Sequence, residues 1–158
     1  MKKSNVLVTA SGGIVAQGII KCLNIANKQK KSDTIYKIIA TDISAKAPGL
    51  YRADEGVLVP PVTAVNYLNF IIKTCIEKKI KAIFIGSDEE LLPLTRASQE
   101  IERKTGAIVL SNPIEVISKA GDKWKTFEYL KENGLPCADS ALPQDQDRFL
   151  REHGFPII

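Results

Sequence analysis

The chain is 158 residues long and carries 22 lysines and arginines against 18 aspartates and glutamates, for a formal net charge of +4. This length predicts one domain with its own hydrophobic core, and no apolar run reaches the ~18 residues that would suggest a membrane span. The three cysteines lie far apart, only one histidine occurs and no basic stripe stands out, so we expect a reduced, cytoplasmic protein without metal or nucleic acid.

Short apolar runs alternate with helical periodicity over the first 110 residues, which predicts βαβ units and a mostly parallel α/β sheet. Right-handed crossovers would place the connecting helices on both faces of that sheet. Five strands are expected, at residues 5–9, 35–41, 57–59, 82–85 and 107–110. Between the second and third of them we expect an irregular stretch.

The helices between these strands have an inward apolar face. We interpret Cys22 and Cys75 as small core residues on the inward faces of the first two helices. A third helix opens at the N-cap residue Ser87, with Glu90 at the position of the return arm of a capping box. Its inward stripe continues to Ile101, as one helix.

After Gly121 the pattern changes to helices without intervening strands. Residues 122–133 predict a helix with Trp124 facing inward, and a further helix is expected at about 144–152. The apolar residues 155–158 resemble the start of a strand. Since an unpaired strand leaves backbone donors and acceptors without partners, we expect the sequence to be a fragment of a longer polypeptide.

Two loops of the first half contain residues that suit a small ligand. The turn with Ser11, Gly12 and Gly13 joins the first strand to the first helix, where backbone N–H groups can receive an anion. Asp42 ends the second strand and could accept a hydrogen bond from a ribose or another hydroxyl group. The full G-x-G-x-x-G fingerprint is not present, so the glycines can equally serve only to let the chain turn.

Three charged residues stand at helix starts. Asp88 and Glu89 follow the fourth strand, at the edge where open α/β sheets bind ligands, but acids in a first turn also favour the helix dipole. Lys123 opens a helix, where a cation is unfavourable, and a flexible ammonium suits a nucleotide phosphate. Taken alone, a solvated surface lysine is the simpler interpretation.

The order of these motifs resembles the front of an ATP-grasp enzyme. It runs from the glycine-rich turn through Thr-Asp at 41–42, Gly-Ser-Asp-Glu-Glu-Leu at 86–91 and Asp-Lys at 122–123 to Gly-Phe-Pro-Ile-Ile at 154–158. The sequence is most similar to the carbamoyl-phosphate-synthase large-subunit-like branch, over essentially its whole length. A free-standing carboxylate–amine ligase fits equally well.

The resemblance implies two domains and a set of site residues. Residues 1–119 would form a Rossmann-like pre-ATP-grasp domain, and residues 120–158 the start of the ATP-grasp fold. Lys123 would contact ATP, with Asp42 as a further possible contact to a ligand. Five residues would face the acceptor substrate: Ser11, Gly12, Gly13, Asp88 and Glu89.

The same resemblance implies a reaction. ATP would convert a carboxylate into an acyl phosphate, from which an amine displaces phosphate, with Mg²⁺ stabilising the transferred group. The Mg²⁺ ligands are expected in a missing C-terminal part, so the fragment itself would be inactive. Small-molecule carboxylates and amines are the expected partners, and a homodimer is an option.

Two other interpretations stay open at this point. Residues 8–14 also resemble the opening turn of an NAD(P)-dependent short-chain reductase or epimerase, although no Tyr-x-x-x-Lys pair occurs in the sequence. The chain could also be a non-catalytic α/β module that binds a small ligand. Binding of a ligand without turnover would distinguish that case from an enzyme.

Overall fold

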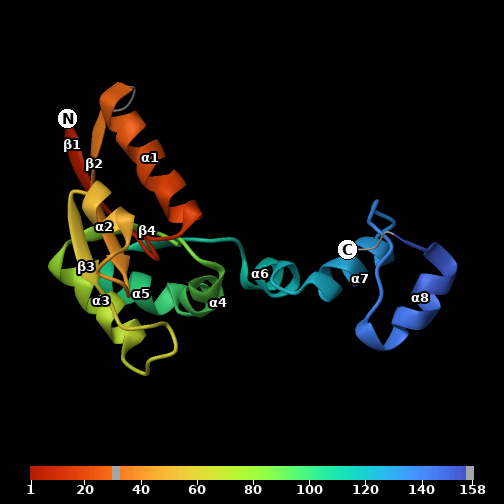
Figure 1. Ribbon diagram of the computed structural model, residues 1–158. Helices are drawn as coiled ribbons and strands as arrows, with labels where there is room; N and C mark the ends of the chain where they lie inside the picture. Colours follow the sequence, from red (N-terminus) through yellow and green to blue (C-terminus); the bar gives the residue numbers. More distant parts are fainter. Residues whose placement is uncertain (30–32, 156–158) are drawn as a thin grey trace. The chain divides into compact units, whose positions relative to one another are not determined.

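A computed structural model of the chain describes residues 1–29 and 33–155 (Figure 1). The chain divides into two compact units, Met1–Ile114 and a second unit that begins at Glu115. In chain order the first unit contains β1 (Lys2–Val8), α1 (Ile14–Gln29), β2 (Thr34–Asp42), α2 (Pro48–Arg52), β3 (Glu55–Leu58), α3 (Tyr67–Glu77), β4 (Ile80–Phe84), α4 (Asp88–Arg96), α5 (Ser98–Thr105) and β5 (Ile108–Leu110).

The five strands form one parallel sheet in the order β3-β2-β1-β4-β5. This confirms the predicted α/β fold with a Rossmann-like parallel sheet. Four of the five strands begin earlier than the apolar runs suggest: β1 pairs with β2 from Lys2 onward, and β4 starts at Ile80, whereas β5 begins one residue late, at Ile108. The hydrogen bonds of a sheet are made by the backbone, so pairing can extend into polar residues at the start of a strand. An apolar side-chain pattern does not reveal those residues.

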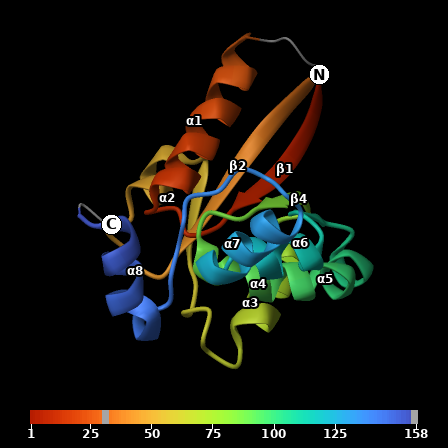
Figure 2. The ribbon, with the colours of Figure 1, turned by 90° about the vertical axis from the view of Figure 1, so that its right-hand side faces the viewer.

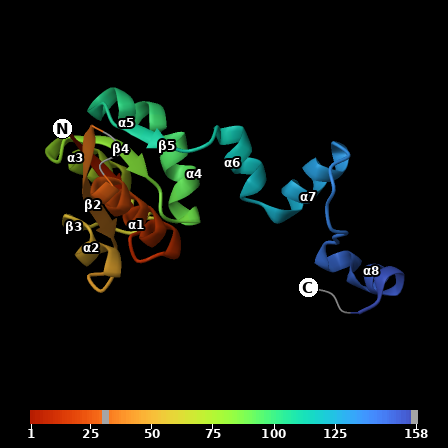
Figure 3. The ribbon, with the colours of Figure 1, turned by 90° about the horizontal axis from the view of Figure 1, so that it is seen from above.

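Helices cover both faces of the sheet, as predicted (Figures 2 and 3). On one face, Val6 and Val8 of β1 pack with Ala16 and Ile20 of α1. On the other face, Leu7 of β1 belongs to the core formed with α3, α4 and α5. Since side chains alternate along a strand, the unbroken apolar run of β1 supplies both cores, as expected of a strand buried on both faces.

The inward face of α1 differs from the prediction. Cys22 is exposed, and the buried residues of this helix are Ala16, Ile20 and Leu23. The interpretation of Cys22 as a core residue was wrong, because the buried face of α1 is a narrow stripe that passes beside it. Cys75 on α3 is buried, as predicted, and burial raises the pKa of its thiol to about 12.

The third predicted helix is in fact two helices. It breaks at Ala97, whose ψ angle of 0° departs from the roughly −42° of a regular helix. Leu94 of α4 and Ile101 of α5 are nevertheless both buried on the same side of the sheet. The stretch expected to be irregular contains the short helix α2, which starts with a proline at its first turn.

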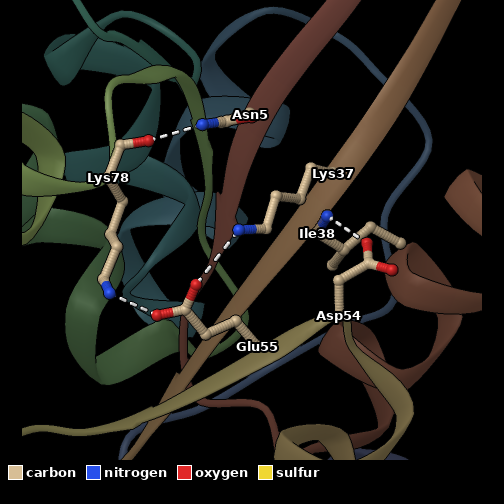
Figure 4. Close-up of polar contacts among 6 residues, drawn as sticks. All are labelled: Asn5, Lys37, Ile38, Asp54, Glu55 and Lys78. Atoms are coloured by element: carbon tan, nitrogen blue, oxygen red, sulfur yellow. Dashed lines mark hydrogen bonds and ion pairs between the residues drawn. The ribbon is translucent and has the colours of Figure 1, made fainter.

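At the amino ends of β3 and β4, polar contacts tie the sheet to the helix layer (Figure 4). Glu55 pairs with Lys78 and accepts a hydrogen bond from Lys37 Nζ at 3.2 Å. We call these three residues the amino-end cluster. Asn5 donates to the Lys78 carbonyl at 2.6 Å, and Asp54 accepts from the Ile38 N–H at 2.7 Å. The glutamate in this cluster meets two cations, so its charge is compensated.

The second unit is helical. After α6 (Ile114–Ala120) come α7 (Lys123–Glu132), a 3-10 helix (Pro143–Asp145) and α8 (Gln146–His153). The rings of Trp124 and Phe127 lie 5.1 Å apart, but no side chain of α7 is buried, so the predicted inward face is only partly covered. The strand expected at 155–158 falls mostly outside the described residues, and the domain boundary at residue 119 stays a prediction. No helix in residues 1–29 or 33–155 is both long and apolar enough to cross a bilayer.

Candidate functional site

The carboxyl ends of the strands surround a cavity of about 670 Å³ in the first unit. Four loops contribute to it, and we call it the carboxyl-edge cavity. Its lining residues are Ala10, Gly12, Gly13, 42–44, 61–63 and 87–90. The strand order reverses between β1 and β4, and open α/β sheets bind ligands at such a switch point. The volume is within the range of small-molecule sites.

The glycine-rich turn between β1 and α1 is held by its own hydrogen bonds. The Ser11 N–H donates to the Thr41 carbonyl at 2.9 Å, and the Gly13 N–H donates to the Ala10 carbonyl at 3.0 Å. The Gly12 N–H donates to Asp42 Oδ2 at 2.7 Å. These three N–H groups are therefore already engaged, and they do not form the open anion site that the turn suggested.

Asp42 connects two of the loops around the cavity. Its Oδ2 accepts from Gly12 and its Oδ1 accepts from the Ser44 N–H at 2.9 Å. A Cβ atom added at Gly12 would approach Oδ2 to 3.2 Å, so the turn and the carboxylate fit closely. Asp42 lines the cavity, but both of its carboxylate oxygens accept hydrogen bonds from backbone N–H groups. Its clearest role is therefore to fix the positions of the two loops.

The structure brings four of the five predicted acceptor-side residues to the cavity wall. Gly12, Gly13, Asp88 and Glu89 all line it, and the two acids are exposed. Ser11 is fully buried and is not among the lining residues. Its hydroxyl group finds no hydrogen-bond partner in the described part of the chain.

The first turn of α4 contains one residue, Glu90, whose role was assigned incorrectly from the sequence. Ser87 caps α4, as predicted, and accepts from the Glu90 N–H at 3.4 Å. The Glu90 side chain does not return to the cap, as a capping box requires. It is buried, and Oε1 accepts a hydrogen bond from the Tyr67 hydroxyl at 2.7 Å. The sequence did contain a signal for this burial. Glu90 lies four residues before the buried Leu94, and residues with that spacing lie on the same face of a helix.

Burial dominates the electrostatics of this pair. It raises the pKa of Glu90, and the negative charges of Asp42 and Glu89 act in the same direction. The hydroxyl groups of Thr9 and Tyr67 oppose the shift by favouring the ionised carboxylate. The pKa of Tyr67 is also raised, first by burial and then by Glu90. Tyr67 therefore stays a neutral hydrogen-bond donor.

Lys123 belongs to the second unit, at the first position of α7. Its neighbour Asp122 caps this helix, with Oδ1 accepting from the N–H groups of Trp124 at 2.9 Å and Lys125 at 3.2 Å. The Lys123 side chain is exposed. A further cavity of about 600 Å³ lies between α7 and α8, and Lys123 is not among its lining residues. A nucleotide contact by Lys123 stays a prediction.

Comparisons with known proteins give a family and a fold. A family model described as "PylC-like, N-terminal domain" matches residues 7–110. The chain is similar to the biotin carboxylase domain of a thermophilic 2-oxoglutarate carboxylase bound to bicarbonate, with 22% identity, a TM-score of 0.57, and 96% of this chain and 34% of that chain covered. No curated protein matches the sequence.

Two further structures show the same similarity. N5-carboxyaminoimidazole synthetase from Staphylococcus aureus, complexed with ADP, is 18% identical with a TM-score of 0.59. The alignment covers 99% of this chain and 37% of that one. The complete pyruvate carboxylase from Rhizobium etli is 16% identical with a TM-score of 0.61, over 92% of this chain and 14% of that one. The chain thus spans about a third of these structures or less, and they show the fold alone.

Proposed function

Since the chain belongs to the family of PylC-like N-terminal domains, we propose that it is the N-terminal part of an ATP-dependent ligase that joins a carboxylate to an amine. The family and the fold confirm the predicted resemblance to the pre-ATP-grasp domain of ATP-grasp enzymes. The closer similarity to carbamoyl-phosphate synthase stays a prediction.

The carboxyl-edge cavity is the proposed binding site for the acceptor substrate. The observation that carries the proposal is that Gly12, Gly13, Asp88 and Glu89 line one cavity of small-molecule size at the switch point of the sheet. The loops there are fixed by backbone hydrogen bonds and by Asp42. A preformed site of this kind orients a small substrate before the reaction.

The proposed reaction has two steps. The γ-phosphoryl group of ATP is transferred to the substrate carboxylate, and an amine then displaces phosphate from the acyl phosphate, which forms the C–N bond. Bound Mg²⁺ would neutralise the phosphate oxygens during the transfer. Among residues 1–29 and 33–155, no three metal-ligating side chains come together, and we propose that the Mg²⁺ ligands lie in a C-terminal part of the longer parent.

Within this chain, Lys123 is the residue proposed to contact ATP. Its ammonium group is exposed, and Asp122 beside it accepts from the backbone N–H groups of Trp124 and Lys125, so a phosphate can approach the ammonium group. The biotin carboxylase domain and the N5-carboxyaminoimidazole synthetase are each about three times as long as this chain. We therefore propose that the ligase activity belongs to a longer cytoplasmic parent, that the 158 residues alone are inactive, and that a homodimer is an option for the parent.

The reductase alternative loses its main support. A dinucleotide site needs free N–H groups at the glycine-rich turn and an acid free to accept from the ribose. Here Ser11, Gly12 and Gly13 donate to protein atoms, and both oxygens of Asp42 accept from backbone N–H groups. The acids that line the cavity would also repel a pyrophosphate.

Nucleotide binding tests the proposed function. In the full-length parent, Lys123→Ala should weaken ADP binding about tenfold, as expected for the loss of one charge-assisted hydrogen bond. Lys125→Ala is the matched control, because Lys125 is an exposed lysine on the same helix turn. The measurement is isothermal titration calorimetry with Mg²⁺ present. Equal affinities of the two variants and the wild type would remove Lys123 from the site.

A further inference from the structure

A buried carboxylate joins segments that lie far apart in the sequence. Glu90, in the first turn of α4, accepts a hydrogen bond at Oε1 from the Tyr67 hydroxyl group at 2.7 Å. The Thr9 hydroxyl group is a second hydrogen-bond partner of the same carboxylate. All three side chains are buried, with exposed fractions of 6% for Glu90, 3% for Tyr67 and 0% for Thr9. Since hydrogen bonds to a charged group away from water are strong, Glu90 is a junction between α4, the start of α3 and the end of β1.

The contact with Thr9 leads to two loops of the carboxyl-edge cavity. Thr9 Oγ1 accepts a hydrogen bond from the Gly86 N–H at 3.2 Å. Ala10, which follows Thr9, and Ser87, which follows Gly86, both line the cavity. The Thr9 hydroxyl group therefore connects Glu90 to the glycine-rich turn and to the loop between β4 and α4.

The contact with Tyr67 leads to a third loop. The Tyr67 N–H donates to the Ala64 carbonyl at 3.0 Å, and the Ala64 N–H donates to the Pro61 carbonyl at 2.9 Å. Pro61 is one of the residues that line the cavity. Together with the two loops that Thr9 connects, three of the four loops around the cavity are therefore joined through Glu90.

The charged groups around this junction are acids. Asp42, at the end of β2, and Glu89, next to Glu90 on α4, add negative charge, and the residues described around the cavity include no lysine, arginine or histidine. Burial and these two acids raise the pKa of Glu90, while the two hydroxyl groups oppose the shift. Loss of the proton makes the buried group less favourable overall, but it strengthens both hydrogen bonds that the carboxylate accepts. The two protonation states of Glu90 therefore differ in how firmly the loops are joined.

We propose that Glu90 is the positioning residue of the acceptor-substrate site: through Thr9 and Tyr67 it fixes three of the four loops around the carboxyl-edge cavity, and these loops shift together when Glu90 gains or loses its proton. This inference rests on the proposed function, since it concerns how the site assigned there to the acceptor substrate is held and regulated. Glu90 acts through the loops, and it needs no contact of its own with the substrate.

A pH titration of the 158-residue chain without ligand tests this proposal. The ¹³C signal of the Glu90 carboxyl group, identified as the glutamate signal absent from Glu90→Gln, gives the midpoint of its titration. We expect a midpoint above the ordinary value of 4.5, and a step at the same midpoint in the ¹⁵N-edited amide signals of all three loops. Glu90→Gln should abolish that step. Glu100→Gln removes an acid of α5 that is paired with Lys104 and does not line the cavity, so it should titrate as the wild type does.

Two variants that each remove one hydroxyl group show whether the effect passes through the hydrogen bonds. Thr9→Val and Tyr67→Phe keep the charge of Glu90, and each should raise its midpoint by about one pH unit, as expected for the loss of one hydrogen bond to a carboxylate. Thr9→Val should reduce the amide step in the glycine-rich turn and leave the step in residues 62–64, and Tyr67→Phe should do the reverse. These two variants also test the junction if Glu90→Gln fails to fold.

The outcomes that overturn this inference differ from those that overturn the proposed function. A Glu90 midpoint at or below 4.5, or loops that titrate at unrelated midpoints, would reject Glu90 as the positioning residue. Amide steps that persist unchanged in both hydroxyl variants would reject it too, because they would come from the electric field of the charge alone. None of these results changes the nucleotide affinity of the Lys123 variants, which tests the ligase assignment separately.

Discussion

Two glutamates at opposite ends of the sheet show how differently the same side chain can be used. Glu55, in the amino-end cluster, meets the ammonium groups of Lys37 and Lys78, and these cations lower its pKa (Figure 4). Glu90, at the carboxyl-edge cavity, meets a hydroxyl group and other acids, and burial raises its pKa. At one end of the sheet the carboxylate is paired with two cations, and at the other end it is buried beside hydroxyl groups and other acids.

The carboxyl edge should also be the end that tolerates least change in its backbone. Gly86 lies between β4 and the cavity-lining Ser87, and a Cβ atom added there would come within 2.0 Å of the Thr9 carbonyl oxygen. Gly86→Ala should lower the free energy of unfolding by about 3 kcal/mol or more, because the two loops would have to separate. Urea denaturation followed by circular dichroism measures this.

Gly18→Ala is the matched control for that prediction. Gly18 lies within α1, and apart from the adjacent residues and the helix's own backbone no atom lies within 4 Å of the added methyl group, so alanine should raise stability, by up to about 1 kcal/mol. If both variants lose the same stability, close backbone contact is not what fixes the loops of the carboxyl edge.

The second prediction concerns the charge of Glu90. Glu90→Gln should raise the free energy of unfolding of the ligand-free protein at pH 7 to 8, by about 1 to 3 kcal/mol, since a buried carboxylate without a counter-charge is unfavourable. A raised folded-state pKa means that the folded protein binds the proton more tightly than the unfolded chain. The stability that Glu90 contributes is therefore present below its ordinary pKa of 4.5 and is lost as the pH rises through the raised value.

The pH dependence is the sharper part of that test. The difference between the variant and the wild type should be large at pH 8 and small near pH 4, when both are measured by urea denaturation. A variant that is less stable than the wild type at every pH would mean that the free protein already compensates the charge of Glu90. The contrast between the two ends of the sheet would then disappear.

How much the sequence predicts depends on whether a feature is local. Val6–Val8 form an unbroken apolar run, so β1 was predictable as a strand buried on both faces. Gly12 and Asp88 were predictable as cavity residues because each lies a few residues beyond the carboxyl end of a parallel strand, and parallel strands end at one edge. The ligand of these residues was not predictable, because the sequence pattern does not show which backbone N–H groups already donate to other atoms of the protein.

The errors come from contacts that are distant in the sequence. Glu90 was assigned to a capping box because the local pattern of α4 fits one, whereas its actual partner, Tyr67, is 23 residues away. Cys22 fits the apolar period of α1 but faces solvent. In both cases a local pattern allowed two side-chain directions, and tertiary packing selected one.

The smallest predicted effect is at the amino end. Glu55→Gln should lower the free energy of unfolding by less than about 1 kcal/mol, because the pairs with Lys37 and Lys78 are partly exposed and salt screens them. With a lowered folded-state pKa, the contribution of Glu55 is present above its ordinary pKa of 4.5 and is lost as the pH falls through the lowered value, opposite to Glu90. Urea denaturation at pH 7 and pH 3, at low and high salt, measures it. The free energy of unfolding of the variant should differ from that of the wild type at pH 7 in low salt and match it at pH 3. A difference that persists in 1 M salt would show that packing, and not charge, stabilises this end of the sheet.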